Sequence, residues 1–242
     1  MLAVAVDSGN FKVYAPLANF YWEGEDFEIA TGLHIKKLKN TPNLAGMEKW
    51  VGKDEWQSAL STDYWLIFDW ATDNTPSPSE IINLVLLSLW LIKPVRCHVK
   101  LHFARGLGSA SGENKRSRHL DRFMWVPGTI DPDFTQKEMR QLSRYYRKLA
   151  SICTTRGRLN DALLLTITGC WSHAWQSSII CHSAAVETIL TYSTARGLTF
   201  RLAKSYACLT RRSKFKRDKA FKNFRNLYSI RSDLVHGRTF NV

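Results

Sequence analysis

The chain has 242 residues, of which 45% are hydrophobic and 23% are charged. This composition excludes wholesale disorder, a collagen-like repeat and a small disulfide-stapled scaffold. The formal net charge of +13 indicates a polyanionic partner, although a basic surface that only keeps a protein in solution gives the same excess.

The basic excess lies in the second half of the chain. Residues 1–110 hold 10 Lys or Arg and 12 Asp or Glu, whereas residues 111–242 hold 24 and 9. This asymmetry predicts two units with different tasks, the second facing an anion. No signal-peptide pattern opens the sequence, and the strongest apolar run, 81–92, is shorter than the roughly 20 residues of a membrane span. We therefore expect a cytoplasmic protein with reduced thiols and no membrane partner.

The first 130 residues alternate between apolar and polar positions in the manner of strands around one helix. Ser79 is expected to cap a helix over residues 80–93. Residues 95–103 predict a strand with one apolar side and one solvent-exposed, basic side that includes His98 and His102. The other predicted strands are residues 11–15, 27–29, 33–35 and 64–68.

The glycine-rich stretch 106–112 predicts a flexible loop. A phosphate-binding loop is disfavoured there, because no Gly-Lys-Ser/Thr follows. The prolines near residues 127–132 then predict a domain boundary.

From Thr135 onward the pattern becomes helical. Thr135 and Glu138 form a capping box that opens a helix to about Cys153. The sequence thus predicts an α+β N-terminal domain over residues 1–130, of unknown task, followed by an all-α bundle of about five helices over residues 131–242. The later helices are expected from Asn160 or Asp161 to Trp175, from Ser177 or Ser178 to Gly197, over 198–209, and from Lys216 or Asp218 to Gly237.

A strongly basic stretch runs from Arg196 to Arg225, where eleven Lys or Arg face one acid, Asp218. Phosphate contacts from such a segment would bind nucleic acid with strong salt dependence, and a solvated basic face is the alternative. Phe221 and Phe224 lie at helical spacing, which favours packing in the core over base stacking. The candidate nucleic-acid contacts are Arg211, Arg212, Lys214, Lys216 and Arg217.

The candidate catalytic residues lie at the end of the last predicted helix. Arg231 and His236 are separated there by four residues, and they follow Tyr228 and precede Gly237. This Arg-x4-His pattern at the end of a helical bundle resembles the signature of HEPN domains. The resemblance covers about residues 140–237, and the stretches 185–190 and 198–203 extend it to the Apea-like branch. Residues 14–38 are similar to the N-terminal segment that accompanies that branch.

The resemblance implies a HEPN-like bundle that cleaves RNA without a metal or other cofactor, in microbial defence or stress response. It also implies a homodimer, formed through the bundle, in which two Arg-x4-His motifs share one cleft. An imidazole can move protons near neutral pH, and a guanidinium can bind a phosphate through two hydrogen bonds. His236 and Arg231 are therefore the candidate catalytic residues. One histidine cannot be acid and base at once, which favours a two-fold site.

Helix geometry leaves other interpretations of this pair open. Five residues at about 100° each place Arg231 and His236 about 140° apart on an ideal helix, so they share a cleft only if it wraps the helix end or the last turn unwinds. A cationic histidine near a helix C-terminus is also stabilised by the helix dipole without any catalytic role. A non-catalytic module that binds RNA, or that only dimerises, is the main alternative function.

Several neighbours are expected to support the pair. Ser232 and Asp233 lie between its members, and Asp233 either orients the imidazole or contributes only its charge. Tyr228 either stacks on a base or packs in the core, and packing is favoured. Glu187 is expected to form a buried pair with a basic residue such as Arg201, rather than to lie on the surface.

A zinc site is the remaining alternative chemistry. Four potential ligands occur in a helical region rich in apolar residues, where buried thiols and packed imidazoles are the favoured interpretation. They are Cys170, His173, Cys181 and His182.

Overall fold

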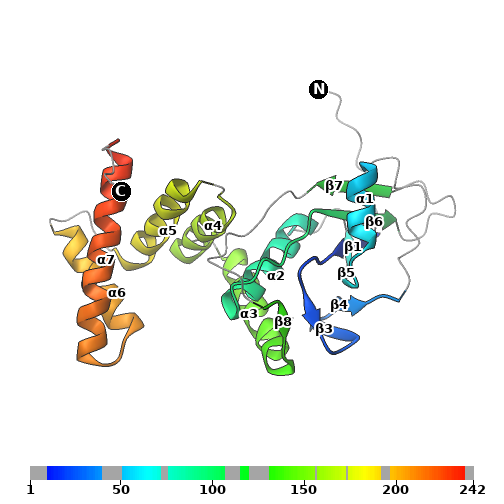
Figure 1. Cartoon of the computed structure of the whole chain (residues 1–242), viewed down its shortest axis with the longest axis horizontal. Coiled ribbons are helices and arrows are strands. Elements are labelled where there is room, and N and C mark those ends of the chain that lie inside the picture. Colours follow the sequence, from blue (N-terminus) through cyan, green and yellow to red (C-terminus); the bar gives the residue numbers. More distant parts are fainter. Residues whose placement is uncertain are drawn as a thin grey trace. The chain divides into compact units, whose positions relative to one another are not determined.

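The computed structural model describes residues 10–39, 51–71, 76–106, 115–119 (backbone only), 131–155, 157–172, 174–191 and 197–237. The chain divides into two compact units, Met1–Ser151 (unit 1) and Ile152–Val242 (unit 2). Unit 1 contains an antiparallel sheet, and unit 2 is helical (Figure 1). This confirms the predicted succession of an α+β region and a helical region, while the HEPN type of the bundle stays a prediction.

The sheet of unit 1 has six strands in the order β3-β4-β5-β1-β6-β7, and every neighbouring pair is antiparallel. Its central strand is β1, in which Val13 lies opposite Phe68 on one side and Ala104 on the other. The strands are β1 (Asn10–Pro16), β3 (Asp26–Ala30), β4 (Leu33–Lys37), β5 (Tyr64–Ala71), β6 (Leu101–Gly106) and β7 (Lys115–His119).

Both faces of the sheet centre are covered. Helix α1 (Lys53–Leu60) packs Trp56 and Ala59 against Trp65 and Phe103 on one face. Helix α2 (Pro78–Ile92), which lies alongside the sheet in Figure 1, is buried without interruption over residues 82–89. Strand β5 is buried at five consecutive positions, as a strand with two covered faces must be.

The predicted solvent-exposed side of residues 95–103 is wrong at His98 and His102, whereas Arg96 is exposed as predicted. His98 and His102 are both buried, because His98 pairs with Ala18 in an isolated bridge and His102 lies in β6 inside the covered sheet. Burial lowers the pKa of His98, outweighing its bond to the Arg96 carbonyl. Only residues 101–106 form a strand here, and the alternating apolar side is buried as predicted.

Helix α2 begins two residues earlier than expected. Its N-cap is Ser77, whose side chain accepts from the Glu80 N–H while the Glu80 carboxylate accepts from the Ser77 N–H, at 3.4 and 2.7 Å. Glu80 is the third residue after Ser77, which is the spacing that a capping box requires, whereas it directly follows Ser79.

Helix α3 (Gln136–Thr154) follows the short strand β8 (Asp133–Phe134), which pairs with β2 (Tyr21–Trp22). Its capping box between Thr135 and Glu138 is confirmed. The helix attaches to unit 1, because Glu138 lies 4.0 Å from Lys93 and the Ser143 hydroxyl donates to the Glu28 carbonyl. The units therefore divide at Ser151, twenty-one residues beyond the expected boundary at 130.

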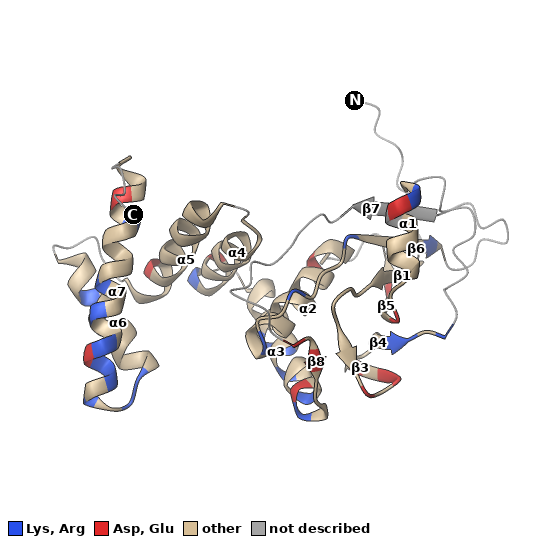
Figure 2. Cartoon of the chain, in the orientation of Figure 1, with Lys and Arg blue, Asp and Glu red and all other residues tan. Residues whose placement is uncertain are grey.

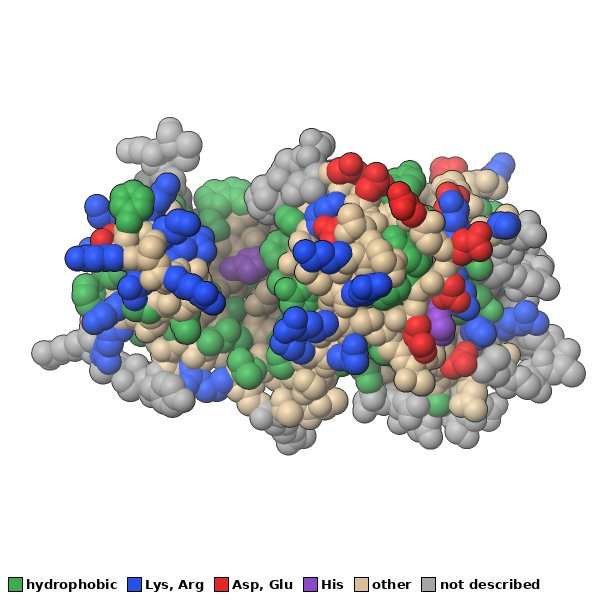
Figure 3. All heavy atoms as spheres, turned by 90° about the horizontal axis from the view of Figure 1, so that it is seen from below, with side chains coloured by type: hydrophobic (Ala, Val, Ile, Leu, Met, Phe, Trp, Pro, Cys, Tyr) green, Lys and Arg blue, Asp and Glu red, His purple; other side chains and the backbone are tan. Residues whose placement is uncertain are grey.

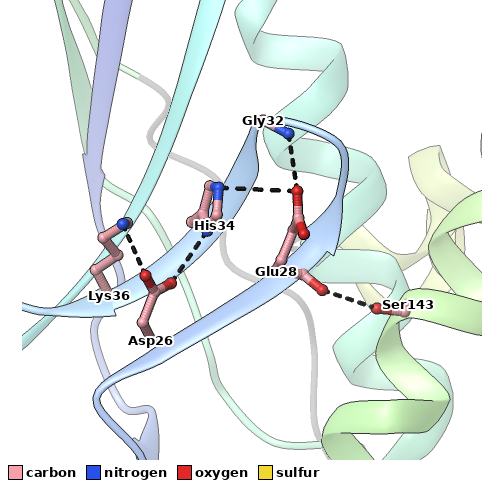
Figure 4. Close-up of polar contacts among 6 residues, drawn as sticks. All are labelled: Asp26, Glu28, Gly32, His34, Lys36 and Ser143. Atoms are coloured by element: carbon pink, nitrogen blue, oxygen red, sulfur yellow. Dashed lines mark hydrogen bonds and ion pairs between the residues drawn. The ribbon is translucent and has the colours of Figure 1, made fainter.

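The β3–β4 hairpin carries a polar cluster on one face (Figure 4). Asp26 accepts from His34 Nδ1 at 3.1 Å and from Lys36 Nζ at 2.7 Å. Glu28 accepts from the N–H of Gly32, which adopts a φ of +75° in the turn. Partial burial raises the pKa of Asp26, but the bonds from Lys36 and His34 outweigh it, and the pKa lies below its ordinary value.

We expect Asp26 to stabilise the fold at neutral pH and not in acid. Its pKa is lower in the folded chain than in the unfolded chain, so its contribution is complete above about pH 4 and is lost as the pH falls through the folded value. Urea unfolding of wild type and Asp26→Asn should therefore differ at pH 7 and converge near pH 3. The exposed Asp63→Asn is the matched control, and an equal pH effect in both variants would contradict this assignment.

Unit 2 contains two helix pairs, α4 with α5 and α6 with α7, and α5 also contacts α6 and α7 (Figure 1). Several ends differ from expectation. Gly157 caps α4 instead of Asn160 or Asp161, and Trp175 begins α5 instead of ending α4. Gly197 caps the start of α6 in the left-handed region rather than ending α5, and Ser213 caps α7, which begins ahead of Lys216. The helices are α4 (Arg158–Trp171), α5 (Trp175–Leu190), α6 (Leu198–Thr210) and α7 (Lys214–Val235).

Helices α4 and α5 lie close together where Gly169 faces His182. A Cβ on Gly169 would lie 2.7 Å from two atoms of the imidazole. The ring is held in place, since His182 Nδ1 contacts the Ser178 carbonyl at 2.8 Å and Nε2 contacts Cys170 Sγ at 3.6 Å. Burial raises the pKa of the Cys170 thiol to about 11, which is typical of a packed thiol.

Gly169→Ala is expected to destabilise unit 2 by about 1–3 kcal/mol through overpacking, despite the better helix propensity of alanine. The free energy of unfolding in urea measures this cost. In a His182→Ala background the methyl group has room, so the cost of Gly169→Ala should shrink there. An undiminished cost in that background would show that His182 is not the obstacle.

Candidate functional site

The candidate residues of unit 2 are built on a small aromatic core between α6 and α7. Leu202 and Ala203 of α6 pack against Phe224 and Tyr228 of α7, with Phe221 packed at its edge. The Phe224 ring stacks on that of Tyr206 at 4.8 Å between centroids. The predicted packing roles of Tyr228, Phe221 and Phe224 are thereby confirmed.

The central polar contact joins α5 to α7. The Tyr228 hydroxyl donates to Glu187 Oε1 at 2.5 Å, and Arg231 Nη2 lies 3.5 Å from the same oxygen. The Arg231 guanidinium also lies over the Tyr228 ring, 5.4 Å from its centroid. Burial, followed by the bond to Glu187, raises the pKa of Tyr228 to about 12, so the phenol stays protonated.

The Arg231 side chain is therefore held in place by Glu187 and the Tyr228 ring. Its Nε is buried and has no hydrogen-bond partner among the described residues, and 24% of its side chain is exposed. The ion pair expected for Glu187 exists, but it is half-buried rather than buried and its cation is Arg231, while Arg201 is exposed. The sequence favoured Arg201 because the packing of α5 against α7 was not visible in it.

His236 lies at the end of α7 as its C-cap residue and is exposed. Its backbone N–H donates to the Ser232 carbonyl at 3.0 Å, and Gly237 then ends the helix in the left-handed region at φ +65°. Ser232 and Asp233 are half-buried. Within the described part of the chain, no hydrogen bond or ion pair joins His236 to Arg231.

The candidate nucleic-acid residues lie at the junction of α6 and α7, and Arg217 alone among them is half-buried. Figure 2 shows that the basic residues gather in the N-terminal half of α7, and Figure 3 shows the basic side chains gathered over α6 and α7. Phe215 is 81% exposed among them and packs in no core. The exposed candidates are Arg211, Arg212, Lys214 and Lys216.

Sequence reasoning missed part of this basic region. Lys219 and Asn223 lie on the same face of α7 as Lys216, and together with Arg211 and Tyr206 they line a groove. The spacing of 216, 219 and 223 was the available signal, since residues three and four apart share a helix face.

Comparison of the chain with protein-family models, curated proteins and solved structures found no match. Over the residues that the structure describes, no three or more His, Cys, Asp or Glu side chains are arranged to hold a metal ion, and His173 lies outside those residues. None of the described helices has both the length and the hydropathy of a membrane span.

We expect Glu187 and Arg231 to be energetically coupled. In a double-mutant cycle of Glu187→Gln and Arg231→Gln, urea unfolding should give a coupling free energy on the order of 1 kcal/mol, because either single change leaves a half-buried polar group without its partner. His236→Ala serves as the control, because its exposed side chain should leave stability unchanged. Additive effects of the two changes would mean that the ion pair contributes nothing.

Proposed function

We propose that the chain is a metal-independent endoribonuclease of the HEPN type that acts as a homodimer in the cytoplasm, in microbial defence or stress response. One observation carries the proposal. An exposed imidazole, His236, ends the same helix that fixes Arg231 against Glu187 and that presents a basic surface at its other end.

The chemistry follows from these side chains. The 2′-hydroxyl of RNA loses its proton to a base and attacks the adjacent phosphorus, so that the P–O2′ bond forms and the P–O5′ bond breaks. The leaving 5′-oxygen takes a proton from an acid, which gives a 2′,3′-cyclic phosphate and a 5′-hydroxyl. His236 serves as one of these proton carriers, and its counterpart in a second copy serves as the other. Arg231 stabilises the charge on the phosphate oxygens.

A second candidate function is RNA binding without cleavage. The Glu187–Arg231 ion pair favours it, because a carboxylate beside the guanidinium reduces the positive charge that a phosphate would meet. A scaffold that only dimerises would need neither the basic surface nor an exposed His236. Binding of RNA without a cut product would therefore replace the first proposal with the second.

RNA cleavage by the purified chain should persist in EDTA and should fall by about 100-fold or more in His236→Ala, as expected for the loss of a general acid or base. Mass spectrometry of the products should detect 2′,3′-cyclic phosphate ends. The matched control is His34→Ala, which removes an imidazole in unit 1 and should leave the rate unchanged.

Two results would contradict the proposal. Full activity in His236→Ala would assign the cleavage to another group, and loss of activity in EDTA that added Mg²⁺ restores would show metal dependence. RNA retention measured by fluorescence anisotropy separates a non-catalytic binder from a chain that does not bind RNA.

A further inference from the structure

A groove of about 260 Å³ lies where the C-terminal end of α6 meets the N-terminal half of α7. Its α7 wall is one face of the helix, since its residues recur at intervals of three and four. The lining residues are Tyr206, Arg211, Lys216, Lys219, Ala220 and Asn223.

The groove is cationic, and none of the described residues that line it is acidic. Arg211, Lys216 and Lys219 contribute three positive charges, and all three are exposed. The nearest acid along α7 is Asp218, which directly precedes Lys219 and so lies about 100° around the helix from it, and about 200° from Lys216. Within the described part of the chain, no ion pair joins Asp218 to the three cations. The charges of the groove therefore remain available to a bound anion.

Packing fixes part of the groove, and its neutral polar residues can donate hydrogen bonds. Ala220 is buried, and Tyr206 is held by its stack on Phe224 at 4.8 Å. The Tyr206 hydroxyl and the Asn223 amide add neutral hydrogen-bond donors to the three cations. Three cations and two neutral donors around one hollow match the oxygens of a phosphate and an adjoining ribose hydroxyl.

The volume limits what fits. Organic ligands usually occupy sites of about 300–1,000 Å³, so a groove of 260 Å³ suits one phosphate with part of its sugar better than a whole nucleotide cofactor. An anionic membrane would instead contact a convex basic and apolar surface, such as that around the exposed Phe215.

We propose that this groove is a subsite for one backbone phosphodiester of single-stranded RNA, separate from the bond that is cut. The proposal rests on the proposed function for its substrate. From Lys219 to Arg231 is twelve residues along α7, which is about 18 Å at 1.5 Å per residue. An RNA must therefore span several nucleotides to occupy both places, whereas a dinucleotide reaches one of them.

Two matched pairs of variants test the groove. Lys216→Gln/Lys219→Gln removes two charges from it. Lys204→Gln/Arg225→Gln removes two charges from exposed positions outside it, each at least about 120° around its helix from the lining residues of that helix. In the second pair, Asn223→Asp places a carboxylate in the groove. Its control, Asn226→Asp, places a carboxylate at an exposed position outside the groove.

Binding of a fluorescent 20-nucleotide single-stranded RNA is the first readout, and it needs no cleavage. The groove double variant should weaken binding about 10-fold or more and flatten the plot of log K against log salt by about 0.7, the value for one lost phosphate contact on a single strand. The control double variant should change binding less than threefold. Asn223→Asp should weaken binding, and Asn226→Asp should not.

The second readout is cleavage of a dinucleoside monophosphate and of the 20-nucleotide RNA. The groove double variant should raise KM for the long RNA and leave the dinucleotide rate unchanged, whereas His236→Ala should abolish both. Equal behaviour of groove and control variants would overturn the groove proposal while leaving His236 to its own test. If wild type binds but does not cut, the anisotropy result alone decides the groove, and absence of RNA binding would overturn it.

Vesicles containing phosphatidylserine distinguish the other anionic partner. Wild-type binding to the RNA should persist in their presence. If the groove variants lost vesicle binding but kept RNA binding, the surface would belong to a membrane and the proposal would be overturned.

Discussion

The carboxylate of Glu187 determines how the C-terminal half of α7 sits on the rest of unit 2. One of its oxygens accepts the Tyr228 hydroxyl and faces the Arg231 guanidinium. A phenol and a guanidinium that are largely withdrawn from water both cost free energy unless they are paired. Because α5 supplies that partner, it fixes the rotation of α7 about its own axis, and hence the direction of every later residue up to His236.

The two halves of α7 carry different properties on one rigid element. The first half is basic and mostly exposed, whereas the second half packs Tyr228, carries Arg231 and ends at the His236 cap. A helix of 22 residues is about 33 Å long and keeps its two ends at a fixed spacing. The proposed polyanion site at one end and the proposed proton carrier at the other are thus kept at a fixed spacing by one continuous helix.

Local signals in the sequence predicted most of the elements, and tertiary packing decided what they missed. The Thr135–Glu138 capping box and the Gly237 stop depend on neighbours in the chain, so both were predictable. The buried state of His102 depends on a covered sheet face, and the choice of Arg231 over Arg201 depends on how α5 packs, so neither was predictable from spacing. The N-cap of α2 was predictable as well, because Ser77 and Glu80 already have the capping-box spacing in the sequence.

The Glu187–Arg231 pair also constrains any chemistry at this end of α7. A guanidinium has five N–H donors; the Glu187 contact involves Nη2, and the buried Nε is turned away from solvent. Donors therefore remain for a phosphate, and Arg231 can hold Glu187 and a phosphate together. The carboxylate, however, offsets part of the positive charge, so one copy of the site presents a weakened cation and a single imidazole. Transesterification requires strong charge compensation and two proton carriers, and both requirements are met when a second copy contributes its own Arg231 and His236. In the proposed mechanism, the ion pair makes a solitary chain a poor catalyst and so ties the proposed cleavage to the proposed homodimer.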